Sequence, residues 1–469
     1  MTLLFRIAHR LLSASASSSS SPTIFALSSG AGKAGVAVIR ISGVGAVPAL
    51  QTLLGAQQRV PAVRRASVRT LFDERGDVLD EALVTRFQAP HSFTGTDVVE
   101  LSVHGSVAVV RDLLRRLRAL PGLRDASAGE FTRQAFHNGR IDLTAVEAIA
   151  DLVHADTTAQ RRQAVRQLRG ELGAMYAQWR GTVLRALAHV EALIDFGDDE
   201  RLDVAVLAGA REATARVLEA ASAHLRDARR GERMRSGLSV CLGGRVNVGK
   251  SSLINALAQR QVAIVSPHAG TTRDVLETAL DIAGYPALIS DTAGVRESAD
   301  EVERIGIERA KAHFADADVR VFVTDSDADA ANALASPDAR ATDIVVRNKI
   351  DVAPTTTQLG DGDRRLVAIS CSTGAGLDAF LQHLARSLEQ LTTLGGASES
   401  PLLTRERHRV LVERTVAALQ AAMDVIDSDS VLAAEELRAA VQHLSELTGE
   451  SHDVERLLEI VFREFCIGK

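Results

Sequence analysis

The chain has 469 residues, which exceeds one ordinary hydrophobic core and fits about three domains at roughly 150 residues each. Its composition is 46% hydrophobic and 24% charged, as in a globular protein, and it has no apolar run of the roughly 18 residues that a bilayer crossing needs, which excludes an integral membrane protein. The formal net charge of −6 excludes a surface that is basic overall, so any contact with nucleic acid needs a local basic patch.

The first 22 residues form a serine-rich leader that contains Arg6 and Arg10 but no acidic residue. This composition is typical of a mitochondrial transit peptide. The chain has only five lysines, however, which we associate with a GC-rich bacterial genome in which this leader would be a mis-chosen start. We expect a disordered leader and a cytoplasmic bacterial protein, with the mitochondrial matrix as the alternative. The three cysteines, far apart and without metal-ligand spacing, fit a reducing compartment and predict neither a disulfide nor a zinc site.

Residues 23–138 predict a mixed α/β domain. Short strand-like runs are separated there by turn residues such as Gly95 and Gly105. The runs are Val36–Ile41, Ala82–Phe87 and Val98–Val103.

No proline interrupts the sequence between Pro121 and Pro267, and apolar residues recur there at helical spacing. The pattern returns after Pro401, which predicts one helical domain built from residues 139–235 and 397–469. Between these stretches, residues 236–396 alternate short apolar runs with Gly-rich turns and helices, as a parallel-sheet domain does. We predict an α/β domain inserted into a helical one, because insertions are tolerated where their two ends lie close together.

One helical stretch concentrates arginines, at Arg161, Arg162, Arg166 and Arg169. These residues could form the local patch that a nucleic acid needs. The alternative, which we favour from the sequence, is an ordinary solvated helix face.

A phosphate-binding loop is predicted at residues 244–251. The apolar run Leu238–Leu242 leads into Gly244-Arg-Val-Asn-Val-Gly-Lys-Ser251, which matches G-x-x-x-x-G-K-[ST] and precedes a helical segment. In this pattern backbone N–H groups surround the β-phosphate at a helix N-terminus, the lysine reaches the β- and γ-oxygens, and the serine hydroxyl ligates Mg²⁺. Lys250 and Ser251 are the candidates for these last two roles.

Three further motifs follow in the order expected of a guanine-nucleotide-binding domain. Asp291-Thr292-Ala293-Gly294 ends an apolar run, which directs a carboxylate toward Mg²⁺ and a glycine N–H toward the γ-phosphate. In Asn348-Lys349-Ile350-Asp351 the last carboxylate can accept from guanine N1 and N2, a donor pair that adenine lacks. Ser370-Cys371 ends the next apolar run, where a backbone N–H can meet guanine O6. The motifs together predict a GTP hydrolase.

The segment Gly270–Asp274 lies where a switch loop would supply a threonine to Mg²⁺ and the γ-phosphate, and Thr272 is our candidate. Val295 is apolar at the position where Ras-like GTPases carry the glutamine that positions water. Glu297, close behind, is the carboxylate available to orient the water. The alternative for Glu297 is a solvated loop charge.

With these motifs the sequence resembles the MnmE (TrmE) family of tRNA-modifying GTPases, over nearly the whole chain after residue 23. Family members look like homodimers with a folate-binding N-terminal dimerisation domain, a helical central domain and an inserted Ras-like G domain. The resemblance therefore implies a multidomain fold with α+β and α/β parts. The further segments that carry it are Val38-Ile39-Arg40-Ile41-Ser42-Gly43, Ser92-Phe93-Thr94-Gly95, Gly129-Glu130-Phe131-Thr132, Val146-Glu147-Ala148-Ile149-Ala150-Asp151, Asp300-Glu301-Val302-Glu303-Arg304-Ile305-Gly306 and Phe465-Cys466-Ile467-Gly468-Lys469.

The resemblance implies that the protein acts together with the flavoprotein MnmG (GidA), in a heterotetramer that does not bind a membrane. The two proteins would form the 5-carboxymethylaminomethyl group on the wobble uridine (U34) of certain tRNAs. It also implies activation by K⁺ in place of an arginine finger, because a monovalent cation beside the phosphates neutralises charge that develops in the transition state. Glu297 would activate water. The K⁺ ligands would be Asn247, Ser266, His268 and Thr271, and the Mg²⁺ ligands Ser251 and Thr272. The residues expected around GTP are Asn247, Val248, Gly249, Lys250, Ser251, Ser252, Ser266, Pro267, His268, Ala269, Gly270, Thr271, Thr272, Asp291, Thr292, Ala293, Gly294, Asn348, Lys349, Asp351, Ser370 and Cys371.

The resemblance also implies a site for 5-formyl- or methylene-tetrahydrofolate, formed by Arg40, Glu100, Arg140 and Lys469. A carboxylate can accept from the donor pair of a pterin ring, and an arginine suits the glutamate tail of folate. Without the resemblance, all four residues would count as ordinary surface charges. Cys466 is either a reactive thiol near the folate or, as we favour, a partly buried structural cysteine.

Three positions depart mildly from the family pattern. Arg140 stands where lysine is frequent, Ser266 where threonine is common, and Cys371 where the guanine loop usually has alanine. The departures put little in doubt, because Cys371 would use only its backbone and the K⁺ loop would act largely through its main chain.

Two other functions stay open. A GTP-dependent ribosome-assembly factor would share Asn247 and the apolar Val295, although such proteins usually append RNA-binding modules, which we do not find in this sequence. The third possible function is a binding scaffold in which the GTP switch only controls docking to a partner. Hydrolysis that is much faster in KCl than in NaCl favours the tRNA-modifying enzyme, and negligible turnover in both salts favours the scaffold.

Overall fold

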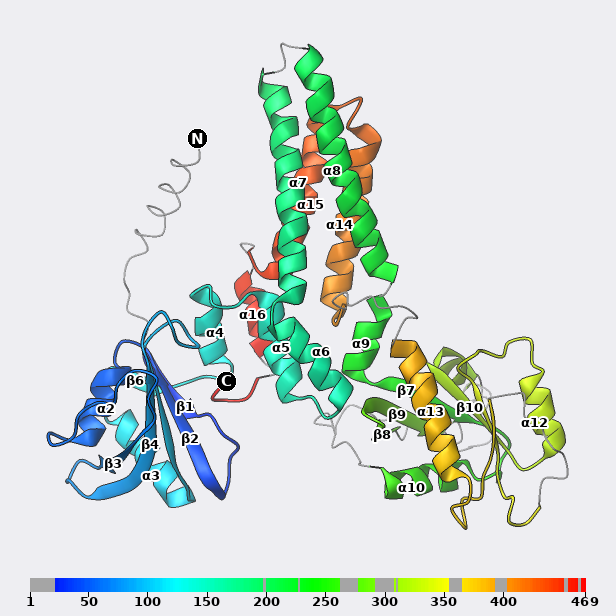
Figure 1. Ribbon diagram of the computed structural model, residues 1–469, viewed down its shortest axis with the longest axis horizontal. Helices are drawn as coiled ribbons and strands as arrows, with labels where there is room; N and C mark the ends of the chain where they lie inside the picture. The colour runs from blue at the N-terminus through cyan, green and yellow to red at the C-terminus, as the bar shows by residue number, and fades with distance from the viewer. Residues whose placement is uncertain are drawn as a thin grey trace. The chain divides into compact units, whose positions relative to one another are not determined.

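The computed structural model describes residues 22–196, 200–226, 228–261, 277–291, 308, 311–353, 365–392, 403–450, 454–462 and 465–469. Its contacts group the chain into two compact units, one made of Met1–Val146 with His452–Lys469 and the other of Glu147–Ser451 (Figure 1). The boundaries of the three domains expected from the sequence stay a prediction, and the grouping differs from them by joining the last residues to the first unit. In the described ranges, none of the helices is both long and apolar enough to cross a membrane.

The first unit contains a six-stranded sheet in the order β3-β4-β5-β2-β1-β6, antiparallel except where β1 pairs with β6. Alternate residues of the central strands, such as Ile39 and Leu101, are fully buried in a core that α2 and α3 complete. The strand-like runs expected from the sequence are confirmed within β2, β4 and β5. The elements are β1 (Thr23–Leu27), β2 (Ala34–Ser42), α2 (Ala46–Leu54), β3 (Ser67–Phe72), β4 (Val78–Phe87), β5 (Val98–Gly105), α3 (Val107–Arg118), β6 (Leu123–Asp125) and α4 (Glu130–His137).

The end of the chain packs into this first unit. After α16 (Val454–Phe462), Ile467 pairs with Ala128 in an isolated antiparallel bridge, and the N–H of Phe131 donates to the carbonyl oxygen of Lys469 at 3.2 Å. Gly468 has φ +98°, and a Cβ at that position would lie 2.1 Å from the carbonyl oxygen of Leu27. Only glycine therefore allows the terminal turn to approach β1 this closely.

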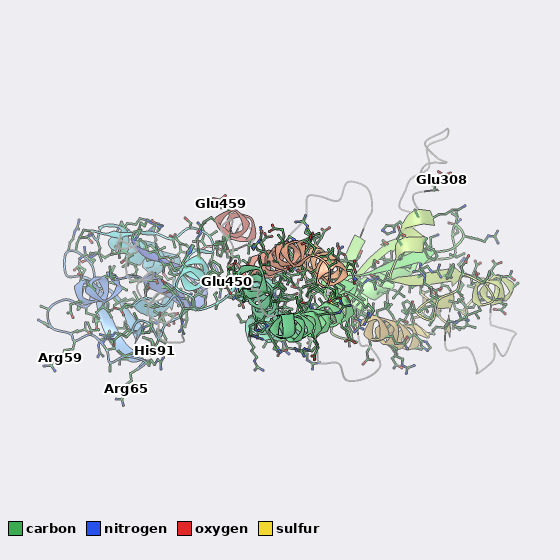
Figure 2. All side chains as sticks on the ribbon, turned by 90° about the horizontal axis from the view of Figure 1, so that it is seen from above. Arg59, Arg65, His91, Glu308, Glu450 and Glu459 are labelled. Carbon is green, nitrogen blue, oxygen red and sulfur yellow. The ribbon has the colours of Figure 1, made fainter. Side chains whose placement is uncertain are left out.

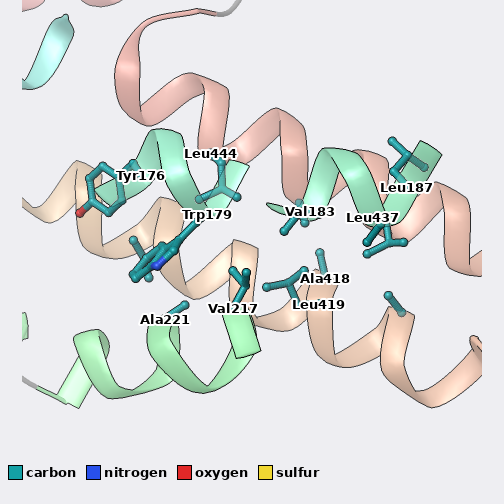
Figure 3. Packing of buried hydrophobic residues seen from close by; sticks show 14 of the residues in the cluster. Tyr176, Trp179, Val183, Leu187, Val217, Ala221, Ala418, Leu419, Leu437 and Leu444 are labelled. Carbon is teal, nitrogen blue, oxygen red and sulfur yellow. The ribbon is translucent and has the colours of Figure 1, made fainter. Parts of the chain in front are cut away.

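Four long helices of the second unit pack side by side around one apolar core, and Figure 2 shows them nearly end-on. Tyr176, Val183, Leu419, Leu437 and Leu444 interdigitate in this core (Figure 3). The helices expected on both sides of the inserted segment are thus confirmed. The long helices are α7 (Glu171–Phe196), α8 (Glu200–Arg226), α14 (Glu406–Val425) and α15 (Ser430–Thr448), and the shorter ones are α5 (Leu143–Val153), α6 (Thr158–Leu168) and α9 (Ala228–Ser236).

The second unit also contains a six-stranded sheet in the order β12-β11-β10-β7-β9-β8, in which only β8 runs antiparallel to its neighbour. The strand β7 lies between β10 and β9, so the chain winds outward from it in both directions. In such a sheet, ligands bind outside the carboxyl ends of the strands where the winding reverses. The elements are β7 (Leu238–Gly243), α10 (Lys250–Arg260), β8 (Glu277–Ile282), β9 (Tyr285–Asp291), β10 (Val319–Thr324), α12 (Asp327–Leu334), β11 (Ile344–Arg347), β12 (Leu366–Ala368) and α13 (Leu377–Thr392).

Candidate functional site

The loop between β7 and α10 has a backbone that depends on its glycines. Gly244 has φ +142°, and a Cβ there would lie 2.1 Å from the carbonyl oxygen of Val323. Gly249 has φ +102°, and a Cβ there would lie 2.2 Å from the side-chain nitrogen of Asn348. Asn247 is also left-handed, with φ +63°. The loop therefore lies tightly against the ends of β10 and β11, and it leads directly into the N-terminus of α10, where unpaired N–H groups favour an anion.

Lys250 and Ser251 extend from the first turn of α10. The Lys250 side chain is nearly buried, and its ammonium donates to the carbonyl oxygens of Gly244 and Arg245 at 3.0 Å each. The Ser251 hydroxyl donates to Oδ2 of Asp291 at 3.0 Å, which connects this helix to the end of β9. The geometry thus brings a cation, a hydroxyl and a carboxylate to one end of the loop.

Asn348 holds the loops at three strand ends together. Its buried side-chain amide donates to the carbonyl oxygen of Val248 at 2.8 Å and accepts from the N–H of Cys371 at 3.3 Å. Its own N–H donates to the carbonyl oxygen of Thr324 at the end of β10. The phosphate-loop motif and the Asn348-to-Asp351 motif are therefore joined by one side chain.

Lys349 and Asp351 have partners that sequence reasoning did not identify. The Lys349 ammonium donates to the carbonyl oxygen of Asn247 at 2.7 Å and to Asp325 at 2.8 Å. The Ser372 hydroxyl donates to Oδ2 of Asp351 at 2.7 Å. The Ser370 and Ser372 hydroxyls lower the pKa of Asp351, which keeps the exposed carboxylate ionised. The sequence offered one signal that Asp325 belongs to the site. It directly follows β10, and every other strand of this parallel set is also followed by, or ends in, a predicted site residue.

Several expected site residues lie outside the described residues. They are Ser266, Pro267, His268, Ala269, Gly270, Thr271, Thr272, Thr292, Ala293, Gly294 and Glu297. Other expected site residues lie within the described part and gather at the carboxyl edge of the sheet, linked by the contacts above or by their place at its strand ends. They are Asn247, Val248, Lys250, Ser251, Asp291, Asn348, Lys349, Asp351, Ser370 and Cys371.

The four residues predicted for a folate site lie around two phenylalanines in the first unit. Arg40 and Glu100 stand directly opposite each other on β2 and β5 and form an ion pair at 2.9 Å. The Arg40 guanidinium lies 5.5 Å from the ring centroids of both Phe93 and Phe131. Lys469 is fixed by its carbonyl contact with Phe131, described above.

Arg140 reaches the same region by packing on the loop that contains Phe93. A Cβ on Gly95 would lie 3.2 Å from Cγ of Arg140, and Nδ2 of Asn138 donates to the carbonyl oxygen of Thr94 at 2.6 Å. Sequence reasoning missed a supporting set of hydroxyl and amide contacts beneath this loop. Ser42 lies within 2.9 Å of Thr94, Thr96 and Gln134 side chains, which fixes the loop.

Comparison with known proteins assigns the chain to a family. A model for the TrmE N-terminus, described as that of a GTP-binding protein, matches residues 23–140, and one for the MnmE helical domain matches residues 143–466. The chain is 46% identical to the human mitochondrial 5-taurinomethyluridine-[tRNA] synthase subunit GTPB3, over 99% of this chain and 96% of that protein. It is also 46% identical to the tRNA modification GTPase MnmE of Bradyrhizobium sp., over 95% of this chain and 99% of that protein. Among solved structures, the G domain of the T. maritima FeoB iron transporter is 26% identical, with 32% of this chain and 98% of that chain covered and a TM-score of 0.24. The chain belongs to the MnmE (TrmE) family of tRNA modification GTPases.

Proposed function

We propose that the chain hydrolyses GTP and that this hydrolysis drives a step in forming the 5-carboxymethylaminomethyl group on the wobble uridine of certain tRNAs. The observation that carries the proposal is the junction at Asn348, where one side chain joins the loop for phosphates to the motif for guanine. Relatives that match over nearly their full length carry names of tRNA modification enzymes, which favours this function over ribosome assembly.

The phosphates of GTP would occupy the loop at residues 244–251. Backbone N–H groups at the start of α10 would donate to them, and Lys250 would exchange its contacts with Gly244 and Arg245 for phosphate oxygens. Ser251 and Asp291 fit Mg²⁺, because this ion takes oxygen ligands, few of them from protein, and the two side chains already lie 3.0 Å apart. Bound Mg²⁺ would supply positive charge at the phosphate oxygens.

The guanine ring would lie between Asn348 and Asp351. The ionised Asp351 would accept from N1 and N2 of guanine, with Ser372 holding its other oxygen, and the N–H of Cys371 would lie near O6. Lys349 would pack along the base while Asp325 and the carbonyl of Asn247 hold its ammonium. The selectivity for guanine thus follows from hydrogen-bond geometry.

Our proposal retains the remaining expectations from the family resemblance. The Asn247 side chain carries an amide oxygen, a suitable ligand for a hard cation such as K⁺, and the other expected K⁺ ligands are Ser266, His268 and Thr271. Thr272 would join Ser251 at Mg²⁺, and Glu297 would orient the attacking water. Homodimerisation and a heterotetramer with the flavoprotein MnmG remain part of the proposal. The compartment stays a prediction, since relatives of equal identity include mitochondrial and bacterial proteins.

The folate site is proposed for the face of the first unit that carries Arg40, Glu100, Arg140 and Lys469. Phe93, a residue that is 39% exposed, offers an apolar surface beside the Arg40–Glu100 pair, which suits a flat pterin with polar edges. When bound, the folate would supply a one-carbon unit. Arg140 and Lys469 would provide positive charge for the carboxylates of its tail.

The test of the function is mass spectrometry of wobble uridines from cells that lack this gene. We expect the carboxymethylaminomethyl group to be missing, and a plasmid copy of the gene to restore it. GTP hydrolysis by the purified chain should be much faster in KCl than in NaCl. Intact modification without the gene would refute the tRNA role, whereas equal rates in the two salts would refute only the K⁺ role.

A further inference from the structure

A groove of about 520 Å³ lies between α7 and α8, away from the sheet that carries the GTP motifs. Its lining includes Arg185, His189 and Arg216 but no acidic residue, in a chain whose Asp and Glu outnumber its Lys and Arg by 60 to 54. Gln178 and Thr182 add polar side chains along the α7 side. The lining therefore concentrates positive charge and hydrogen-bond donors in one concave place.

Trp179 and the two arginines of the groove differ in what surrounds them. Trp179 lines the groove with 8% of its surface exposed, so its indole adds a mostly buried aromatic face to the lining. The exposed Arg185 contacts the Thr182 hydroxyl at 3.2 Å and forms no ion pair within the described ranges, whereas Arg216 contacts the exposed Glu212 at 2.7 Å.

The length of the groove favours a polymer over a single small anion. Gln178 and His189 are eleven positions apart on α7, which is about 16 Å along a helix. Arg185 lies on α7 and Arg216 faces it from α8, and Gln178, Thr182 and His189 are spread along the α7 side, so the polar groups follow the groove instead of converging on one point. Phosphates repeated along an RNA backbone match such an arrangement, because arginine, glutamine and threonine side chains commonly contact them.

We propose that this groove, defined by Gln178, Trp179, Thr182, Arg185, His189 and Arg216, binds the phosphate backbone of tRNA. The proposal rests on the function proposed above, since an acidic chain that acts on tRNA needs a local basic surface. The arginines of α6 provide a comparison surface. Arg166 pairs there with Glu171 at 3.0 Å, whereas Arg161, Arg162 and Arg169 are exposed on a helix that contributes nothing to the groove lining.

The experiment uses the only tryptophan of the chain as its probe. An unmodified tRNA transcript with a wobble uridine is titrated into the full-length protein at several salt concentrations, and Trp179 emission is recorded. We expect tRNA to change the emission and inorganic phosphate at equal phosphate concentration to leave it unchanged. The double variant Arg185→Ala with Arg216→Ala should weaken tRNA binding by roughly 10- to 50-fold near 0.1 M salt and reduce the salt slope by about 1.5. The matched control, Arg161→Ala with Arg162→Ala, should bind tRNA as the unaltered protein does.

Three results would overturn the proposal: an unchanged Trp179 emission, an equal loss of tRNA binding in both double variants, or the same emission change with inorganic phosphate. Circular dichroism melting curves confirm that the variants fold. GTP hydrolysis without tRNA should be the same in both. Failure of the groove leaves hydrolysis and cellular tRNA modification intact, whereas failure of the proposed function appears as normal modification in cells without the gene.

Discussion

Arg235 and Asp151 are joined by a hydrogen bond of 2.8 Å, although they lie 84 positions apart. The same oxygen of Asp151 also accepts from Arg405 at 2.8 Å. Arg235 lies in the last turn of α9, just before the sheet domain begins at β7, and Arg405 caps α14, just after the chain has returned from it. The Asp151 carboxylate of α5 therefore holds both segments of the chain that connect the helices with the sheet of β7 to β12.

We expect Asp151→Ala to destabilise this junction by about 1–3 kcal/mol, because it leaves two guanidinium groups without their shared acceptor. The melting temperature, followed by Trp179 fluorescence, should fall by several degrees. A suitable control is Asp427→Ala, which removes an exposed pair with Arg211 and should change the melting temperature little. Equal melting temperatures for Asp151→Ala and the unaltered protein would show that the junction is held by other contacts.

Lys250→Ala should abolish measurable GTP binding, because the loop would lose the one ammonium that lies buried against it. Affinity is measured with a fluorescent GTP analogue in the presence of Mg²⁺ and K⁺. Lys311→Ala, at an exposed position of the second unit, should bind the analogue normally. If Lys250→Ala retained full affinity, the assignment of the phosphate loop would be wrong.

Asp351→Asn should convert the preference for guanine into one for xanthine. The amide loses an acceptor for N1–H and N2–H of guanine but gains a donor that suits the second carbonyl of xanthine. We expect GTP affinity to fall by roughly 10- to 100-fold, the cost of about one charged hydrogen bond. Competition between GTP and xanthosine triphosphate measures the change. Asp378→Asn, which alters an exposed carboxylate on α13, should leave the ratio of the two affinities unchanged.

The stability of the helical core should decrease as the pH falls from about 7 to about 5. Burial, followed by the nearby His408, lowers the pKa of His224 to about 4. The unfolded imidazole protonates near its ordinary pKa of about 6.5, so the unfolded state takes up more protons over this range and is favoured by roughly 2 kcal/mol. His224→Gln should reduce the pH dependence of the urea midpoint. An identical midpoint at both pH values in the unaltered protein would contradict the expectation.

The residues at the strand ends of the sheet β12-β11-β10-β7-β9-β8 were predictable, because each belongs to a motif of a few consecutive residues. Gly249 and Lys250 belong to one short motif, and an apolar run before each motif predicted the strand that positions it. The place of Asp325 after β10 was a signal that it belongs to the site, but its contact with Lys349 and the contact of Ser372 with Asp351 were not predictable, because each depends on which loops the folded sheet brings together. The contact of Asp151 with Arg405 was even less predictable, since the two residues lie 254 positions apart and no periodicity indicates such a contact.

In the first unit, the resemblance named Arg40 and Glu100, but only the register of β2 and β5 shows them as a pair. Phe93 and Phe131 belong to segments that carry the family resemblance, but the sequence assigned no role to their aromatic rings. Their position beside Arg40 depends on contacts between a loop, a helix and a strand, which a linear pattern does not contain.

The side chain of Asn348 has a consequence for how this protein can change over time. A substitution that moved Val248 to suit a different phosphate would pull on the same amide that supports Cys371. A substitution at Asn348 itself would consequently disturb recognition of the base and binding of the phosphates together.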